Sequence, residues 1–120
     1  MRMWLCDPKI MCQQHLCGEH VEMHMFLGTL KQGKKIDGYL KNNLFEPLAL
    51  FSRHEELRRE MTDRGYNHKS EMYGVPDVVF NLSEEKNSIR IDRDKALKDL
   101  LDRCPKCRGR YINERRKPKK

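Results

Sequence analysis

A helical spacing of apolar side chains near the beginning of the chain is the feature that most constrains its fold. These side chains recur at intervals of four, three, four and three residues, in the series Leu16, His20, Met23, Leu27 and Leu30. The spacing places them along one side of an α-helix. Asp7-Pro8 is a typical helix start, with Asp as the N-cap and Pro at the first helical position. We therefore predict one long helix from Asp7 to Gly33.

Two further segments carry the same period. The second predicted helix begins at Glu46-Pro47 and ends at Arg64-Gly65, and its buried side would hold Leu50, Phe51, His54, Leu57 and Met61. The third extends from its cap Asp92 to Arg103, with an apolar face of Ala96, Leu97, Leu100 and Leu101. We predict a loop with one short turn, around Tyr39-Leu40, over residues 31–43. Residues 66–88 are predicted as an irregular connection that buries Val78, Val79 and Phe80.

These elements define the expected fold class. The 120 residues have the length of one domain, and no pair of segments has a convincing strand pattern. We expect an all-α protein, a compact single domain of three main helices with ordered loops. This helical domain would cover residues 1–105, because Pro105 ends the third helix, and a basic C-terminal tail would cover residues 106–120.

Charge is distributed unevenly along the chain. Residues 103–120 hold nine Lys or Arg and one acidic residue, whereas residues 1–102 hold 16 basic and 17 acidic residues. A neutral body with a strongly basic end is typical of proteins that bind the phosphate backbone of nucleic acids. The alternative is a tail that only keeps the protein in solution.

The composition also argues against several classes of protein. No stretch reaches the roughly 20 apolar residues of a membrane span, and the first eight residues lack the apolar segment of a secretion signal. We therefore expect a protein that is not secreted and has no membrane partner, located in the cytoplasm or at the nucleoid. The five cysteines follow no secreted-type framework, and we expect reduced thiols.

Glu22 stands out on the first predicted helix. At 100° per residue it lies on the side of Gly18 and Met25, away from the apolar stripe. We therefore expect Glu22 to be exposed or to line a cleft. Gly18, one turn earlier, would leave room for a ligand or for another chain segment. The plainer interpretation is a solvated glutamate beside a glycine that serves helix packing.

The spacing of cysteine and histidine leaves a metal site open. Cys104-Pro105-Lys106-Cys107 is one half of a zinc ribbon or knuckle, and His20 and His24 have the spacing of a two-histidine metal face. The chain has no second Cys-x-x-Cys, so a complete site would need to recruit His20, His24, Cys6, Cys12 or Cys17. The alternative is that these side chains fill core positions. We assign no metal ligand and expect no cofactor.

Three blocks of the sequence resemble a known family in their order and spacing. The first holds Arg2, Gln14-His15-Leu16, Glu19, Glu22 and Gly28; the second holds Arg53, Glu56-Leu57 and Arg64-Gly65-Tyr66-Asn67, followed by Lys69; the third holds Ser88-Ile89-Arg90-Ile91 and Pro105. Over most of residues 1–105, the chain resembles the pyrimidine-dimer DNA glycosylases with AP-lyase activity, the phage endonuclease V type.

The resemblance implies a compact three-helix fold and catalysis by the chain's own terminal amine. In that family the amine attacks C1′ of the damaged nucleotide and displaces the base, and the resulting Schiff base permits β-elimination of the strand. Here the amine would be that of Met1, where the family typically has a Thr exposed by methionine removal. The assisting carboxylate corresponds to Glu22, and His15 is expected near the site as a third catalytic residue. The α-amine class has pKa values of about 7.7–8.0 against about 10.4 for lysine, which favours the free base.

The expected DNA-binding residues come from the family blocks, the first helix and the basic segments: Arg2, Gln14, Gly18, Met25, Lys34, Lys35, Lys69, Arg108, Arg110, Arg115 and Arg116. The family has one arginine just before the catalytic glutamate and another three residues after it, whereas this chain has Val21 and Met25. The basic arm replaces the family's aromatic-rich C-terminal tail. The identity of the lesion is therefore left open: it can be a pyrimidine dimer, an oxidised pyrimidine, a hypermodified base or a bare abasic site.

The expected function is that of a DNA repair glycosylase with AP-lyase activity, acting as a monomer on double-stranded DNA that holds a damaged or modified base. Two other functions remain open. A non-catalytic DNA-binding module would need only the basic tail, and a zinc-dependent interaction protein would be built on Cys104 and Cys107. The enzyme requires a free terminal amine and Glu22, whereas the zinc protein requires stoichiometric metal.

Overall fold

The computed structural model describes residues 1–66 and 71–116, and within them it contains helices and no strand. The expected all-α fold class is confirmed. The elements in chain order are η1 Pro8–Ile10, α1 Gln13–Lys31, α2 Asp37–Lys41, η2 Pro47–Ala49, α3 Leu50–Asp63, α4 Val75–Phe80, α5 Glu84–Asn87, α6 Arg93–Arg103 and α7 Pro105–Arg116.

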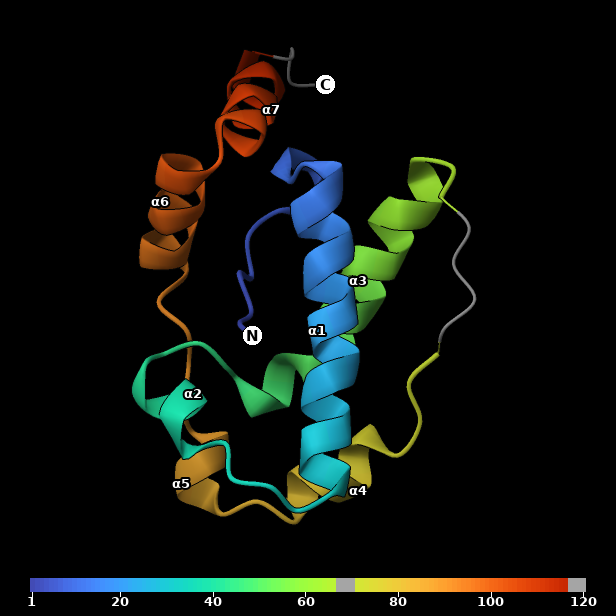
Figure 1. Ribbon diagram of the computed structural model, residues 1–120, viewed down its shortest axis with the longest axis vertical. Helices are drawn as coiled ribbons and strands as arrows, with labels where there is room; N and C mark the ends of the chain where they lie inside the picture. Colours follow the sequence, from blue (N-terminus) through green and yellow to red (C-terminus); the bar gives the residue numbers. More distant parts are fainter. Residues whose placement is uncertain (67–70, 117–120) are drawn as a thin grey trace.

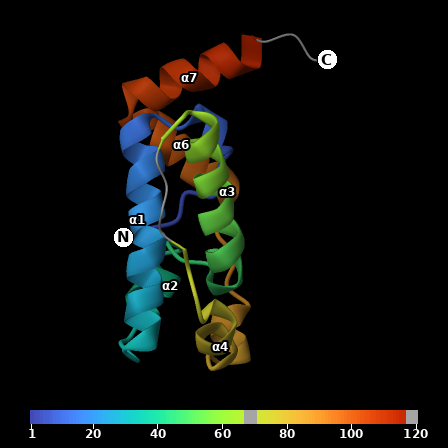
Figure 2. The ribbon, with the colours of Figure 1, turned by 90° about the vertical axis from the view of Figure 1, so that its right-hand side faces the viewer.

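The long helices α1 and α3 pack side by side and form the centre of the molecule (Figures 1 and 2). The N-terminal segment lies between α1 and α6, because the Met1 amine is 4.0 Å from Glu22 of α1 and the Arg2 guanidinium is 4.0 Å from Asp99 of α6. The last helix, α7, crosses the end of this bundle near the start of α1 (Figure 2). The chain's beginning and its basic end are thus both attached to α1.

The first helix begins later than its sequence pattern predicts. Asp7 accepts a hydrogen bond from the Lys9 amide, but it caps only the 3-10 turn η1. Met11 then takes an extended conformation, and Cys12 becomes the N-cap of α1. This break lets the side chains of Met11 and Cys12 turn into the core. The apolar stripe itself is confirmed, since Leu16, His20, Met23 and Leu27 are buried and Leu30 is partly buried.

The second and third predicted helices correspond to α3 and α6. A 3-10 turn, η2, precedes α3, and Gly65 follows its end with a φ of 84°, a left-handed conformation that suits glycine. The predicted burial of Phe51 is wrong, because its side chain is 48% exposed and Arg53 is buried instead. The prediction that Asp92 caps α6 is confirmed by its hydrogen bond from the Lys95 amide.

Three helices lie where the sequence did not predict them. The connection over residues 66–88 contains α4 and α5, with a left-handed Gly74 before α4. Val79 is buried as expected, but Phe80 is 76% exposed. Pro105 ends α6 and also begins α7, because a proline has no amide to lose in a first helical turn. The basic segment up to Arg116 is therefore a helix rather than a tail, and residues 117–120 lie outside the described part of the chain.

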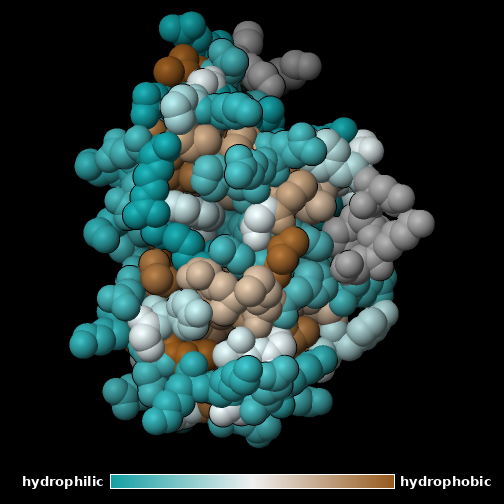
Figure 3. Space-filling view, viewed as in Figure 1, coloured by the Kyte–Doolittle hydropathy of each residue, from teal (hydrophilic) through white to brown (hydrophobic). Residues whose placement is uncertain are grey.

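Apolar side chains gather in the middle of the face shown in Figure 3, with hydrophilic side chains above and below them. The charged residues, 36% of the sequence, account for the mostly hydrophilic remainder. In the described part of the chain, no helix has both the length and the apolar character that crossing a bilayer requires.

A buried ion pair joins the two central helices. Arg53 of α3 donates two hydrogen bonds to the Glu19 carboxylate of α1, at 2.6 and 2.9 Å, and a third to the carbonyl of Cys6 at 2.7 Å. Both charged side chains are at most 1% exposed. Burial lowers the pKa of Arg53, but the hydrogen bonds to Glu19 and the negative charges of Glu19 and other neighbours together outweigh it and leave the pKa above its ordinary value. The pair therefore fixes α1, α3 and the N-terminal segment relative to one another.

Removing the arginine should destabilise the protein strongly. Arg53→Met would leave the Glu19 carboxylate buried without its partner, which costs about 3–5 kcal/mol of unfolding free energy. Denaturant unfolding followed by circular dichroism measures the loss. The double variant Glu19→Met/Arg53→Met should recover a large part of it, because no charge is then buried. Arg58→Ala, at an exposed position of the same helix, serves as the control and should change stability by less than about 0.5 kcal/mol.

Candidate active site

The Met1 amine and the Glu22 carboxylate lie at the wall of an open pocket of about 600 Å³. The amine nitrogen is 4.0 Å from Oε1 of Glu22, and the Arg2 amide donates a hydrogen bond to Oε2 at 3.3 Å. The pocket is lined by Met1, Arg2, Trp4, Gln14, His15, Gly18, Glu19, Glu22, Leu44 and Arg103. The site thus combines the chain's beginning, one side of α1 and the end of α6.

Three backbone-directed contacts hold the N-terminal segment in this position. The Met3 amide donates to the Leu44 carbonyl at 2.8 Å, Arg53 binds the Cys6 carbonyl, and the Arg2 amide binds Glu22. Met3 itself is fully buried. The two residues before this anchor therefore have little freedom, and the amine faces α1.

The two acidic side chains of the pocket have different surroundings. Glu19 is fully engaged by Arg53 and faces the protein interior. Glu22, one turn later, keeps 30% of its side chain exposed and contacts only the chain's first two residues among the interactions described. The position of Glu22 off the buried stripe, predicted from the helix period, is found in the structure. Its carboxylate is the group that can exchange protons with a ligand in the pocket.

The Arg2 side chain forms another part of the wall. Its guanidinium carbon lies 3.8 Å from the ring centre of Trp4, and its Nη1 is 4.0 Å from Asp99. Burial lowers the pKa of Arg2, and the charge of Asp99 opposes that effect. Among the described residues, no hydrogen-bond acceptor meets the buried Nε of Arg2. The Arg2 guanidinium thus adds a positive charge to the pocket wall, although its Nε is itself buried.

Gln14, His15 and Gly18 of the first helix, which were predicted to belong to the site, line the pocket, whereas Met25 does not. Gln14 and Gly18 are exposed to it, and His15 is partly buried. No atom would lie within 4 Å of a Cβ added at Gly18, so no other backbone approaches this glycine, contrary to one of the two expectations. The room beside Gly18 belongs to the pocket. The His15 ring turns its Nδ1 toward the sulfur of Cys12, 3.2 Å away.

The other residues expected to bind DNA lie outside the pocket. Met25 is half exposed further along α1, Lys34 and Lys35 are exposed after its end, and Lys69 lies outside the described residues. Four arginines are on α7. Two of them donate to carbonyl oxygens, Arg110 to Lys9 and Arg108 to Leu101 and Asp102; Arg115 donates to the Tyr111 hydroxyl, and Arg116 is exposed.

Besides Glu19, which was known only as part of the first family block, three pocket residues were not predicted as site residues: Trp4, Leu44 and Arg103. Trp4 belongs to the irregular first segment and Leu44 to a loop, so neither has a periodic signal. Arg103 was counted only as part of the basic end. Arg103 reaches the pocket because α6 packs along the N-terminal segment. No local sequence pattern indicates this long-range contact.

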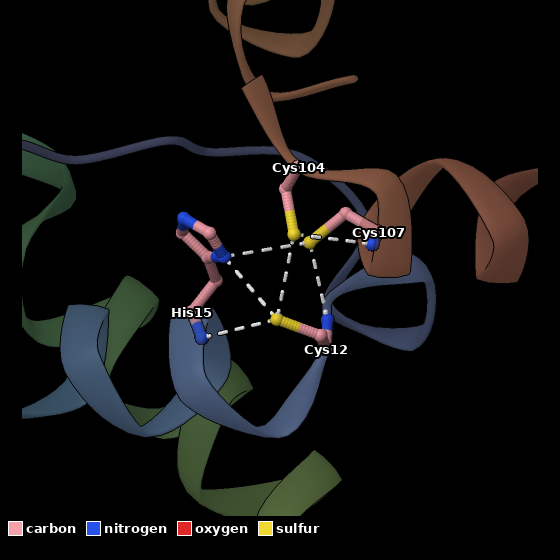
Figure 4. A group of neighbouring side chains, drawn as sticks. All are labelled: Cys12, His15, Cys104 and Cys107. Atoms are coloured by element: carbon pink, nitrogen blue, oxygen red, sulfur yellow. Dashed lines mark hydrogen bonds between the residues drawn. The ribbon is translucent and has the colours of Figure 1, made fainter. Parts of the chain in front are cut away.

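Two groups of side chains in the described residues have the composition of metal ligands. Cys12, His15, Cys104 and Cys107 bring their ligand atoms to within 4.8 Å of one another, as do His20, His24 and His54 (Figure 4 shows the first group). In the second group, Nε2 of His54 is 3.1 Å from Nε2 of His20 and of His24, and Nδ1 of His54 contacts Glu55. The histidine group lies in the interface of α1 and α3, and the cysteine group adjoins the pocket through His15.

A pocket that gathers an amine, a carboxylate and two arginines suits a protein that binds and acts on an anionic ligand. The profile of the family described as pyrimidine dimer DNA glycosylase matches residues 1–74, more than half of the chain. The chain therefore belongs to this family of DNA repair glycosylases. Comparisons with curated proteins and with solved structures give no match. The matched residues include Met1, Glu22 and the whole of α3, and they exclude α4 to α7.

The open space beside Gly18 predicts a graded response to substitution. Gly18→Ala should be tolerated and should stabilise α1 by up to about 1 kcal/mol, whereas Gly18→Leu should fill the pocket. Glycosylase activity on ultraviolet-irradiated duplex DNA should fall at least tenfold in Gly18→Leu with an unchanged melting temperature. Gly28→Leu is the matched control, because Gly28 is also helical and unobstructed but does not line the pocket. Equal losses in the two leucine variants would contradict the assignment of the pocket.

Proposed function

We propose that the chain is a DNA glycosylase with AP-lyase activity whose nucleophile is the α-amine of Met1. The observation that carries the proposal is the position of this amine at the pocket wall, 4.0 Å from the Glu22 carboxylate. Family membership supplies the DNA substrate and the glycosylase class. The lyase step and the roles of the two residues are our inference.

The amine and the carboxylate suffice for the first half of the reaction. The neutral amine donates its lone pair to C1′ of the nucleotide, and the bond from C1′ to the base breaks with its electron pair on the departing base, which takes a proton from solvent. Glu22 accepts a proton from the resulting ammonium and passes it to O4′ as the sugar ring opens. A protonated Schiff base then links Met1 to C1′.

The same carboxylate can serve the second half. As a carboxylate again, Glu22 removes a proton from C2′, and the C3′–O bond breaks with its electron pair on the phosphate oxygen. This β-elimination cuts the strand on the 3′ side. Water then hydrolyses the conjugated imine and releases the amine. A general acid–base group that accepts and returns protons within reach of the nucleophile typically contributes about 10²–10⁴-fold to the rate.

The composition of the pocket favours the terminal amine over a lysine as nucleophile. None of the described residues that line the pocket is a lysine. An α-amine, with an ordinary pKa of about 7.7–8.0, is also a free base far more often at neutral pH than a lysine with about 10.4. The chemistry needs only the backbone amine, so the methionine side chain can replace the threonine usual in relatives.

The substrate must present C1′ outside the base stack. An amine fixed in a pocket reaches C1′ only when the damaged base or its partner leaves the duplex. The open pocket has room for part of an extruded nucleotide, and the guanidinium of Arg2 gives its wall a positive charge that attracts a phosphate. We propose a damaged or modified nucleotide in double-stranded DNA as the substrate. The exposed Val21 and Met25, at positions where the resembled family has arginines, leave its base open.

The basic helix α7 is proposed to supply affinity for the DNA backbone. It carries Arg108, Arg110, Arg115 and Arg116 and packs on η1, close to the start of α1. Arg115 and Arg116 are exposed near its end. Contacts between arginines and phosphates do not depend on the DNA sequence, and the affinity that they supply falls as the salt concentration rises. A body without net positive charge gains most of its attraction to DNA from such an arm.

A covalent trapping experiment tests the nucleophile. Borohydride should reduce the Schiff base and link the untagged protein to duplex DNA with an abasic site, and peptide mapping should find the adduct on the Met1-Arg2 peptide. A short N-terminal extension should abolish trapping, because the new amine lies outside the pocket. Glu22→Gln should keep the melting temperature and slow base release and strand cleavage by about 10²–10⁴-fold.

Two results would contradict this assignment. Trapping that survives the extension, or an adduct on Lys34, Lys35 or Lys69, would exclude Met1 while keeping the lyase class. No trapping with any lesion in a panel of duplexes, together with unchanged DNA affinity of Glu22→Gln, would favour a non-catalytic DNA-binding module.

The role of α7 predicts a change in the salt dependence of DNA binding. Arg115→Ala/Arg116→Ala should lower the slope of log affinity against log salt by about 0.9 for each lost phosphate contact, roughly two units in all. Fluorescence anisotropy with an undamaged duplex measures it. Arg58→Ala/Arg59→Ala removes the same charge from the exposed side of α3 and should leave the slope nearly unchanged. Equal slopes for the two double variants would exclude α7 as the backbone contact.

A further inference from the structure

The four side chains shown in Figure 4 come from two distant parts of the chain and meet at one point. Cys12 and His15 belong to the start of α1, and Cys104 and Cys107 flank the first residues of α7. The three cysteines are buried and His15 is partly buried. We propose that these four residues bind one structural zinc ion, which joins the beginning of α1 to the basic helix α7.

The distances fit a tetrahedral site. Since Zn–S bonds are about 2.3 Å and Zn–N bonds about 2.0–2.1 Å long, two sulfurs on one zinc lie about 3.8 Å apart and a sulfur and a nitrogen about 3.5 Å. The sulfurs of Cys12 and Cys104 are 3.8 Å apart. Nδ1 of His15 is 3.2 Å from the Cys12 sulfur and 3.7 Å from the Cys107 sulfur. Small adjustments would place all four atoms on one ion.

Each of the three sulfurs also receives one backbone hydrogen bond. The amide of His15 donates to the Cys12 sulfur at 3.4 Å, the amide of Cys12 to the Cys107 sulfur at 3.2 Å, and the amide of Cys107 to the Cys104 sulfur at 3.4 Å. Amides aimed at sulfur stabilise the thiolate form that a metal requires. If the three cysteines were neutral thiols that only fill space in the core, there would be no reason for each sulfur to accept a backbone hydrogen bond.

Two helix N-termini add to this electrostatic support. Cys12 is the N-cap of α1, and Cys104 directly precedes the first residue of α7. The positive ends of both helix dipoles therefore point at the cluster and favour negative charge there. Three thiolates and one neutral imidazole on Zn²⁺ carry a net charge of −1, which suits this environment.

The arrangement differs from the two alternatives for clustered cysteines. A disulfide needs sulfur atoms about 2.05 Å apart, whereas the Cys12 and Cys104 sulfurs are 3.8 Å apart and all five cysteines are free. A catalytic zinc keeps one position for water, whereas four protein ligands close the coordination sphere. The site is therefore structural. The zinc proposal does not rest on the proposed lyase chemistry, because none of the four zinc-binding atoms takes part in that reaction.

The proposal gives His15 a role as a metal ligand. Through Nδ1 it would bind zinc, while its ring also lines the pocket that holds Met1 and Glu22. Cys104 and Cys107 lie outside the residues matched by the family profile, whereas Cys12 and His15 lie inside it. The zinc would thus attach a segment outside the family profile to the part that the profile matches.

The metal content and its thiolate ligands can be measured directly. Protein purified from zinc-supplemented medium without chelators should hold about one zinc per chain by mass spectrometry. Replacement by Co²⁺ should give the visible bands of tetrahedral cobalt and thiolate charge-transfer bands in the near ultraviolet. Cys104→Ser should lose or strongly weaken these bands, and Cys17→Ser, at a half-buried cysteine outside the cluster, should keep them. The histidine group of His20, His24 and His54 has no sulfur and cannot produce the thiolate charge-transfer bands.

Substitutions at His15 can distinguish a zinc ligand from a residue that acts in catalysis or only in packing. His15→Ala should lower the affinity for zinc at least tenfold and reduce the melting temperature, and His15→Cys should restore both, because a fourth thiolate can also bind zinc. Sub-stoichiometric zinc in the wild-type protein, cobalt spectra without thiolate bands, or full bands in Cys104→Ser would overturn the proposal. Borohydride trapping on the same preparations reports separately on the amine, so failure of the zinc site and failure of the lyase are distinguishable.

Discussion

The ion pair of Glu19 and Arg53 is the interaction on which the rest of the structure depends. Two charged groups removed from water are tolerated only when each finds partners for most of its polar atoms. Arg53 meets this requirement by binding Glu19 with two nitrogens and the Cys6 carbonyl with a third. The third contact matters for the proposed function, because it fixes the irregular first segment against α1 and α3. An amine at the end of a loosely held segment would not stay beside Glu22.

The sequence predicts much of the fold where one physical rule dominates. The stripe of α1, the cap at Asp92 and the glycine after α3 each follow from helix geometry or capping and were found as expected. The prediction fails where rules compete. Asp7-Pro8 satisfies the rules for a helix start, yet burial of Met11 and Cys12 interrupts that helix after one turn. Phe51 was predicted to be buried but is exposed, whereas the charged Arg53 is buried because it pairs with Glu19.

The candidate site was predictable to the extent that it lies on one helix. Helix period alone places Gly18 and Glu22 on a common side, and both line the pocket, whereas Met25, predicted on the same side, does not. The contributions of Trp4, Leu44 and Arg103 depend on the packing of segments far apart in sequence. His15 was not predicted as a member of the cysteine cluster for a related reason: its contact with Cys107 depends on the packing of α7 at the start of α1.

The short turn η1 has a consequence for how this protein can vary. Arg64, the C-cap of α3, donates to the carbonyls of Pro8 and Met11, and Arg110 of α7 donates to the carbonyl of Lys9. Every residue type has a carbonyl, so the exposed Lys9 can change without loss of these contacts. The arginines have no such freedom, because a lysine cannot present several donors in a fixed plane. Substitutions should therefore be tolerated well at Lys9 and poorly at Arg64 and Arg110, which bind the carbonyls of this turn.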